Sequence, residues 1–376
     1  MSGYAVSGWC PTAWRPMMAG DGLLVRVRPR LARMTGEQVV GLCEVAARFG
    51  NGLIDVTNRA NLQIRGLRDS AMSALLDRLV DLDLVGADPM MEARRTILIA
   101  PDWRRGDDSA QVANGLMARL AALPELPAKV GFAVDAGTAP ILGADPADFR
   151  IERGESRGLI LRADGRELGV PVAVNEAADA MVALAHWFVE TGGAEAGRMS
   201  RHAIPLPAWA QGHVRPAPTR PAILPGCHAL GCVYGVPFGS MEASALAALM
   251  TDSGAEAARV TPWRTLLLEG ASSVDAQGFV TDAADPALRV DACPGAPACP
   301  QATVETRALA MRLAPHIAGR LHMSGCAKGC ARVGPANVTL TGCDGLFDLA
   351  FDARAGDPPI RASLRTDQLL AHFGAD

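Results

Sequence analysis

The stretch Thr57-Asn-Arg-Ala-Asn-Leu-Gln-Ile-Arg-Gly66 returns in altered form as Thr261-Pro-Trp-Arg-Thr-Leu-Leu-Leu-Glu-Gly270. The outer threonine and glycine keep the same register, and each stretch reads as a turn followed by a strand. A helical segment precedes each copy, over residues 36–49 and 239–251. The two copies therefore predict a duplicated unit, although two such segments can also resemble each other by chance.

The first copy reads as alternating strands and helices. We expect strands over residues 23–28, 53–57 and 61–65, and helices over residues 36–49 and 69–82. Thr35 is suited to cap the first helix, which should end at Gly50. This order predicts an α+β fold in which helices cover one face of antiparallel strands.

The two copies differ in charge. In the first copy every second residue of the strand is polar or cationic: Arg59, Asn61, Gln63 and Arg65. At the equivalent positions the second copy has Trp263, Thr265, Leu267 and Glu269, which include no cation. We interpret the first strand as an anion-binding face, with a merely solvated strand face as the alternative.

Four cysteines form two tight pairs late in the chain. Five residues separate Cys293 from Cys299, and three separate Cys326 from Cys330. Four thiolates on short loops suit a [4Fe-4S] cluster. Structural zinc sites usually have shorter gaps, so the five-residue gap rich in proline and glycine favours the cluster. Zinc and four buried structural cysteines are the alternatives.

The surroundings of the cysteines add two expectations. Pro300 opens a helical pattern over residues 301–309, so we expect Cys299 near a helix amino terminus, where negative charge is stabilised. Gly325 and Gly329 would let the backbone approach a bulky cluster. His322, four residues before Cys326, either orients a ligand of the cluster or is an ordinary buried imidazole.

Composition bounds the class of protein. The chain has 376 residues, 49% hydrophobic and 5% aromatic, with a net charge of −4, which argues against nucleic acid or an anionic membrane as the main partner. It lacks both the apolar run of a membrane helix and, in residues 1–10, the pattern of a secretory signal. Nine cysteines in so long a chain do not suggest a disulfide framework, so we expect a cytoplasmic protein.

The chain divides at a proline-rich segment, residues 204–225, which we interpret as a linker. A hairpin is expected from strands 337–341 and 346–350, and a last helix over residues 366–373. The expected units around the linker are residues 1–85, 86–203, 226–285 and 286–376.

These motifs resemble the nitrite/sulfite reductase superfamily over nearly the whole chain. Its C-x5-C and C-x3-C pairs match the cysteines, and its T-x-R-x-x-x-Q strand matches Thr57–Gln63. The resemblance implies two pseudo-repeated ferredoxin-like half-domains and two reductase-type α+β domains. It also implies a [4Fe-4S] cluster on Cys293, Cys299, Cys326 and Cys330, and a substrate site at Arg59, Asn61, Gln63, Arg95 and Lys129.

One departure from the superfamily concerns its paired lysines. Lys129 matches the first, but Gly131 stands where the second is expected, which weakens the case for holding sulfite or nitrite. With the opening Cys10-Pro-Thr-Ala-Trp-Arg-Pro-Met, this departure resembles most the precorrin-3B synthase branch. That resemblance implies O2-dependent hydroxylation of precorrin-3A at C20 with γ-lactone formation in aerobic cobalamin biosynthesis.

The same resemblance implies partners and cofactors. NADH or an electron-donor reductase would supply electrons, and a non-haem iron would accompany the cluster, although its ligands cannot be read from spacing. Carboxylates of the tetrapyrrole would pair with basic residues. The candidates are Arg26, Arg28, Arg59, Arg65, Arg94, Arg95 and Lys129.

Two other functions fit the motifs. A siroheme-dependent nitrite or sulfite reductase would use the same cluster, with Cys330 bridging to the siroheme iron. An electron carrier or a zinc-stabilised binding protein is the third reading. Cys10, Cys227 and Cys232 have no assigned role, and the stretch Cys227-His-Ala-Leu-Gly-Cys232 is more typical of loop or core cysteines than of a metal site.

Overall fold

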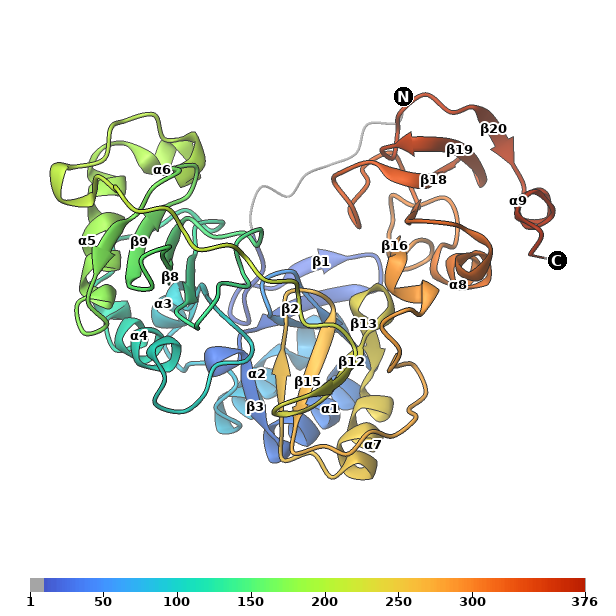
Figure 1. The fold of residues 1–376 in the computed structure, drawn as a ribbon. Coiled ribbons are helices and arrows are strands. Elements are labelled where there is room, and N and C mark those ends of the chain that lie inside the picture. Colours follow the sequence, from blue (N-terminus) through green and yellow to red (C-terminus); the bar gives the residue numbers. More distant parts are fainter. Residues whose placement is uncertain (1–9, 376) are drawn as a thin grey trace.

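The computed structural model describes residues 10–375, which form four five-stranded sheets (Figure 1). Two sheets make a base, and the other two form separate lobes above it on either side. Residues 1–9 and Asp376 lie outside the described residues. The expectation that residues 1–10 are not a secretory signal therefore concerns a stretch that lies almost wholly outside them. The expected α+β class is confirmed.

Each base sheet exchanges one strand with the other. The first has the order β1 (Met17–Ala19), β2 (Gly22–Val27), β5 (Leu62–Leu67), β4 (Leu53–Val56) and β13 (Ser240–Glu242). The second has the order β11 (Gly226–His228), β12 (Gly231–Gly235), β15 (Thr265–Glu269), β14 (Ala257–Val260) and β3 (Arg33–Thr35). The edge strands β3 and β13 thus complete the sheet of the opposite half.

This exchange is reciprocal in its hydrogen bonds. The N–H of Gly36, at the start of α1 (Gly36–Phe49), donates to Glu256 O over 2.8 Å. The N–H of Ala243, at the start of α7 (Ala243–Ser253), donates to Gly52 O over 2.8 Å. Gly36 and Ala243 hold equivalent positions in the two copies, and so do their acceptors. The two hydrogen bonds are therefore equivalent, which supports the duplication predicted from the sequence.

Helix α1 forms where its pattern predicts. The Thr35 side chain accepts the N–H of Gln38, and the Gln38 side chain accepts the N–H of Thr35, so two amino-terminal donors are satisfied. Val39, Leu42 and Val45 are fully buried. The helices α1 and α7 pack on each other beneath the base sheets, and α2 (Met72–Asp81) covers α1 from the side. The second half has no counterpart of α2 among the described residues.

The repeated turn also has the predicted register. Thr57 N–H donates to Asn61 O over 2.9 Å, and Thr261 N–H donates to Thr265 O over 3.2 Å. Each turn contains a residue with positive φ, 53° at Ala60 and 57° at Arg264. Identical backbone geometry at these positions confirms the alignment of the two copies.

The two lobes repeat each other as well, which the sequence did not reveal. The first lobe has β6 (Ile97–Ile99), β7 (Phe132–Asp135), β8 (Phe149–Arg153), β9 (Leu159–Ala163) and β10 (Val170–Val172). The second has β16 (Val290–Ala292), β17 (Leu321–Ser324), β18 (Ala336–Cys343), β19 (Leu346–Ala353) and β20 (Arg361–Leu364). In both, the first three strands are parallel and the last two antiparallel.

Helices occupy corresponding places in the lobes. In the first lobe, α4 (Asp108–Met117) connects β6 to β7 and α5 (Ala177–Glu190) follows β10; short helices α3 (Pro89–Arg94) and α6 (Gly193–Ala196) flank them. In the second lobe, α8 (Arg307–Leu313) and α9 (Thr366–Phe373) take the equivalent positions. The predicted hairpin is present as β18–β19, and α9 has the predicted bounds.

Buried apolar side chains form two clusters. One joins the base to the first lobe, and the other lies within the second lobe. The proline-rich segment 204–225 runs against the first lobe, where Gly169 bridges to Val214 and Gly154 bridges to Pro216. It is therefore held to a sheet edge and is not a free linker. No helix in the described part of the chain is long and apolar enough to cross a membrane.

Candidate functional site

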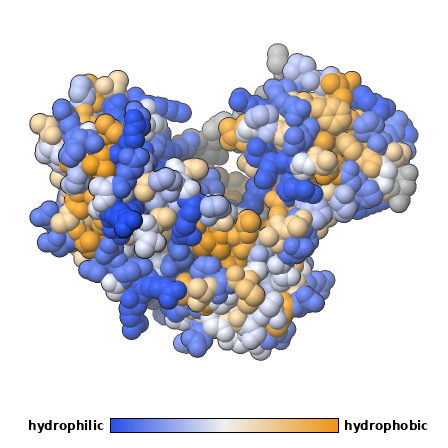
Figure 2. Space-filling view, in the orientation of Figure 1, coloured by the Kyte–Doolittle hydropathy of each residue, from blue (hydrophilic) through white to orange (hydrophobic). Residues whose placement is uncertain are grey.

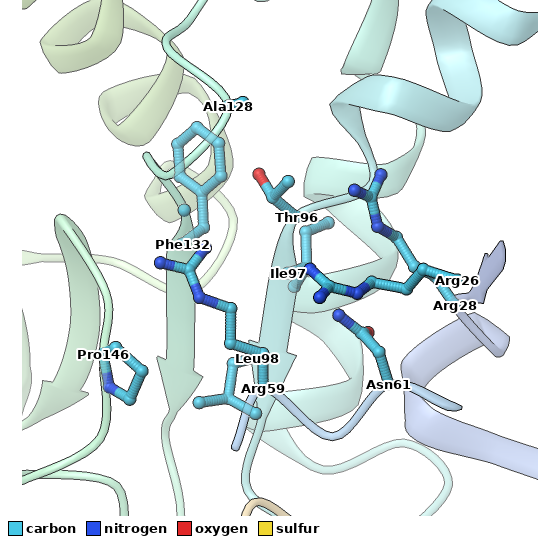
Figure 3. A pocket seen from close by; sticks show the side chains of 11 residues that line it. Arg26, Arg28, Arg59, Asn61, Thr96, Ile97, Leu98, Ala128, Phe132 and Pro146 are labelled. Atoms are coloured by element: carbon cyan, nitrogen blue, oxygen red, sulfur yellow. The ribbon is translucent and has the colours of Figure 1, made fainter. Parts of the chain in front are cut away.

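A cationic pocket lies between the first base sheet and the first lobe (Figure 3). Arg26 reaches it from β2 and Arg28 from the residue just after that strand, while Arg59 and Asn61 come from the turn between β4 and β5. Its other wall belongs to β6, β7 and their loops: Thr96, Ile97, Leu98, Ala128, Gly131, Phe132 and Pro146.

The turn holds Arg59 in place. Thr57 Oγ1 accepts the N–H groups of Arg59 and Asn61 over 3.4 and 3.2 Å, which fixes the backbone on both sides of the positive-φ residue Ala60. Arg59 Nη2 donates to Lys129 O over 2.6 Å, across to the first lobe. Burial lowers the pKa of Arg59, so its guanidinium has lost much of its hydration. An anionic ligand would replace that lost solvation.

Arg26 lies on β2 and is half-buried, and Arg28 follows the strand directly and is buried. Arg26 donates to Gln63 Oε1 over 3.0 Å, and its Nε has no hydrogen-bond partner among the described residues. Burial lowers the pKa of Arg26, against the opposing effect of the neighbouring Cys10 thiol. Arg28 donates to Glu92 O over 2.8 Å, and burial lowers the pKa of Arg28 to about 10. Both therefore add positive charge to the pocket.

Gly131 sets the width of the pocket beside Arg59. A Cβ built on Gly131 would lie 3.0 Å from Thr96 O and 3.6 Å from Arg59 Nη1. Any side chain here would press on the β6 backbone and enter the space in front of the guanidinium. Compared with a lysine, Gly131 therefore removes a positive charge and also leaves space beside Arg59. From the sequence, position 131 was notable only because a lysine is missing there.

The remaining predicted basic residues are mostly engaged elsewhere. Arg95 pairs with the buried Glu92 over 2.8 Å and borders a neighbouring cavity, not this one. Lys129 contributes its carbonyl, while the residue itself is exposed. Arg65 is held by Asp21 and Asp55, at 2.8 and 3.3 Å.

Arg94 donates to the carbonyls of Leu120 and Ala121. The structure therefore brings together Arg59, Asn61, Arg26 and Arg28, with Gln63 as the acceptor for Arg26. Asp21 lies far from Arg65 in the sequence, whereas Glu92 stands three residues before Arg95, a helical spacing that is typical of such ion pairs.

The cysteines lie at one edge of the second lobe. Cys293 follows β16 directly, and Cys326 comes two residues after β17. Because β16 and β17 are parallel neighbours, their carboxyl ends meet and bring the two loops together. Gly325 N–H donates to Cys293 Sγ over 3.2 Å, and Thr303 N–H donates to Gly325 O over 3.1 Å.

The expected helix after Pro300 is not present. The first helix beyond Cys299 is α8, which begins at Arg307. The intervening segment stays in turns because its polar groups bond to the other loop: Thr303 N–H to Gly325 O, and the Thr306 hydroxyl to Cys293 O. These tertiary bonds replace the bonds of a first helical turn, so Cys299 does not lie at a helix amino terminus.

The four thiols interact electrostatically. Burial raises the pKa of Cys330, and the neighbouring thiols of Cys293, Cys326 and Cys299 raise it further, against Lys328. Within residues 10–375, no three His, Cys, Asp or Glu side chains converge on one point as a single metal ion requires. These residues therefore give no ligand set for zinc or for the expected non-haem iron. In a cubane each thiolate binds a different iron, so the four sulfurs surround the cluster without meeting.

Other features of these loops fit a bulky cluster. A Cβ at Gly325 would lie 2.5 Å from Ala302 Cβ, so the two loops already touch at backbone level. Gly329, between Cys326 and Cys330, has a φ of +63°. His322 is fully buried below this loop, and both of its ring nitrogens lack a hydrogen-bond partner among the described residues. An orphaned imidazole beside four free thiols fits a group that the protein binds here.

One hairpin touches both parts of the site. A Cβ on Gly20, in the turn between β1 and β2, would lie 2.7 Å from Ala298 O and from Pro300 Cδ, so this turn packs on the Cys293–Cys299 loop. The strand that follows this turn, β2, carries Arg26, and Arg28 comes just after it; both line the cationic pocket. Figure 2 shows the molecule hollowed between the two lobes, above the base. The cysteine loops and the pocket thus adjoin one strand of the base.

Comparisons with known proteins show which family and which fold the chain is similar to. Residues 15–82 match the family "Nitrite/Sulfite reductase ferredoxin-like half domain". The chain is 32% identical to a precorrin-3B synthase from Sinorhizobium sp, over 94% of this chain and 84% of that protein. Its fold is similar to that of the Mycobacterium tuberculosis NirA protein, with a TM-score of 0.58 and 17% identity over 92% of this chain and 78% of the other.

Proposed function

The chain belongs to the precorrin-3B synthase family, within the nitrite/sulfite reductase fold, and we propose from this that it converts precorrin-3A into precorrin-3B. The proposed reaction hydroxylates the macrocycle at C20 and closes a γ-lactone from the ring-A acetate. One oxygen atom of O2 enters the product and the other leaves as water; NADH or a reductase supplies two electrons, and the two protons of the water come from NADH and solvent.

The pocket of Arg26, Arg28 and Arg59 carries the proposal for substrate binding. Precorrin-3A is a polycarboxylated tetrapyrrole, and guanidinium groups bind carboxylates in bidentate fashion. Arg28 is buried, Arg26 and Arg59 are half-buried, and all three donate to neutral oxygen acceptors of the protein. Acetate and propionate groups of the substrate would supply the missing negative charge, and Asn61 would donate an additional hydrogen bond.

Cys293, Cys299, Cys326 and Cys330 are the proposed ligands of a [4Fe-4S] cluster. When bound, the cluster would supply single electrons for the reduction of oxygen. The chain's own contribution is to hold the four thiols at the edge of the second lobe, with Gly325 N–H directed at Cys293 Sγ. The turn at Gly20 keeps this edge against the strand that carries Arg26.

Incubation of the anaerobically purified protein with precorrin-3A, a reductant and 18O2 tests the proposal. We expect a product heavier by one 18O atom, with the second atom recovered in water. Recovery of unchanged precorrin-3A, with the cluster present and reducible, would refute the assigned reaction. A product labelled from water instead of O2 would also contradict it.

A siroheme-dependent reductase is less well supported. The similarity to the NirA protein concerns the fold only, and Gly131 stands where the superfamily pattern has a lysine. A visible spectrum separates the two functions, because siroheme has strong bands toward the red and a lone cluster has only a broad brown shoulder. Siroheme bands in the purified protein would favour the reductase.

A further inference from the structure

His322 lies on the polar face of the second lobe's sheet. Its neighbours on β17, Leu321 and Met323, belong to the apolar core on the opposite face, as the alternation of a strand requires. His322 is 0% exposed, and neither Nδ1 nor Nε2 has a hydrogen-bond partner among the described residues. An unpartnered buried polar group destabilises the folded protein.

The nitrogen-bearing edge of the ring faces the cysteine loop. A Cβ built on Gly329 would lie 3.6 Å from His322 Cε1, the carbon between the two ring nitrogens. Gly329 directly precedes Cys330, and its loop begins at Cys326. The edge of the imidazole that can form hydrogen bonds is therefore directed at the backbone that joins two of the proposed cluster ligands.

Neighbouring polar side chains are already occupied. Asp291, beside His322 on β16, accepts from Arg264 over 2.7 Å, from Arg320 over 3.1 Å and from Arg332 over 3.4 Å. The hydroxyl of Thr339, beside it on β18, donates to Ala353 O over 2.7 Å. The partner of His322 must then come from the loop side.

We propose that His322 is a positioning residue for the iron–sulfur cluster, donating its ring N–H to a sulfur at the Cys326–Cys330 edge. The inference rests on the cluster of the proposed function. Burial lowers the pKa of His322 to about 4, so the imidazole is neutral at pH 7 and keeps one N–H donor. A hydrogen bond to sulfur stabilises the added electron, so His322 would raise the reduction potential of the cluster.

The test compares cluster potentials in the full-length protein, reconstituted without air. The variants are His322→Leu, which removes the donor, and His322→Gln, which keeps an N–H; Thr339→Val changes a neighbour on the same face and is the control. Iron and sulfide analysis and an EPR-monitored redox titration are the readouts. We expect a more negative midpoint potential in His322→Leu, a smaller shift in His322→Gln and none in Thr339→Val.

The outcomes separate this inference from the proposed function. An intact cluster with an unchanged potential in His322→Leu overturns the role of His322 and makes it a core histidine satisfied by water. If His322→Leu does not fold, His322→Gln provides the test. An unchanged midpoint potential and an unaltered EPR line shape in that variant would overturn the role of His322. Absence of iron and sulfide from the wild-type protein refutes the cluster itself.

Discussion

A Cβ on Gly131 would stand 3.6 Å from the Nη1 atom of Arg59, so the glycine keeps open the space in front of that guanidinium. The same Cβ would lie 3.0 Å from Thr96 O, a tight contact with the backbone before β6. The pocket therefore depends on the small residue at position 131 as much as on the arginines.

Gly131→Lys should reduce affinity for precorrin-3A about tenfold or more, because the new side chain fills the pocket and displaces the β6 edge. Titration of the anaerobic protein with precorrin-3A, followed by absorbance, measures the dissociation constant. Lys129→Ala is the matched control, since that side chain is exposed and only its carbonyl binds Arg59. Equal or tighter binding by Gly131→Lys would contradict the steric role.

Arg59→Ala should weaken binding of precorrin-3A by about 1.5–3 kcal/mol, the range for a hydrogen bond to a charged group. Arg59→Lys should recover only part of this loss, because an ammonium group cannot form the bidentate contact. The same absorbance titration applies. If Arg59→Ala binds as tightly as the wild type, the guanidinium does not contact the substrate.

Cys299→Ser should remove the cluster or convert it to a form with less iron, and turnover should be lost. Iron and sulfide content and the brown absorbance of anaerobic preparations measure the change. Cys343→Ser is the control, because Cys343 is a free, exposed thiol at the end of β18. A full complement of iron in Cys299→Ser would show that the ligand set is wrong.

Asp135 should make stability depend on pH. Burial raises the pKa of Asp135 from 3.8 to about 6, although it accepts the N–H groups of Ile141 and Leu142. The carboxyl of Asp135 therefore binds its proton more tightly in the folded state than in the unfolded state. Protonation of Asp135 stabilises the fold fully below pH 3.8, and this stabilisation is lost as the pH rises through 6. Between pH 5 and pH 8 this loss amounts to about 1.5 kcal/mol.

Asp135→Asn keeps the oxygen acceptor and removes the titration. We compare the free energy of unfolding of this variant with that of the wild type at each pH, from urea denaturation. The difference, variant minus wild type, should increase by about 1.5 kcal/mol from pH 5 to pH 8. Asp367→Asn, at an exposed position on α9, should show no such change relative to the wild type. A constant difference between Asp135→Asn and the wild type across this range would contradict the raised pKa.

Local signals in the sequence predicted a large part of the fold. The Thr35 cap, the repeated turn at Thr57 and Thr261, and the final helix each follow from residues that are neighbours in the chain. Strand exchange was not predictable in this way, because β3 and β13 have three residues each and pair only across the duplicated halves.

For the site, too, local motifs could be recognised in the sequence, whereas the partners that tertiary structure brings near could not. Arg59 and Asn61 lie in a local motif and do line the pocket. Arg65 belongs to the same alternating pattern, but Asp21 and Asp55 neutralise it from other strands and loops. The helix expected after Pro300 fails because Thr303 and Thr306 bond to groups that only the tertiary structure brings near.

The exchanged strands bear on how this protein can be divided. A chain cut within residues 204–225 would give two fragments, each missing the outermost strand of its own base sheet and holding the one its counterpart lacks. Neither fragment is then a self-sufficient folding unit, whereas the two together would complement each other.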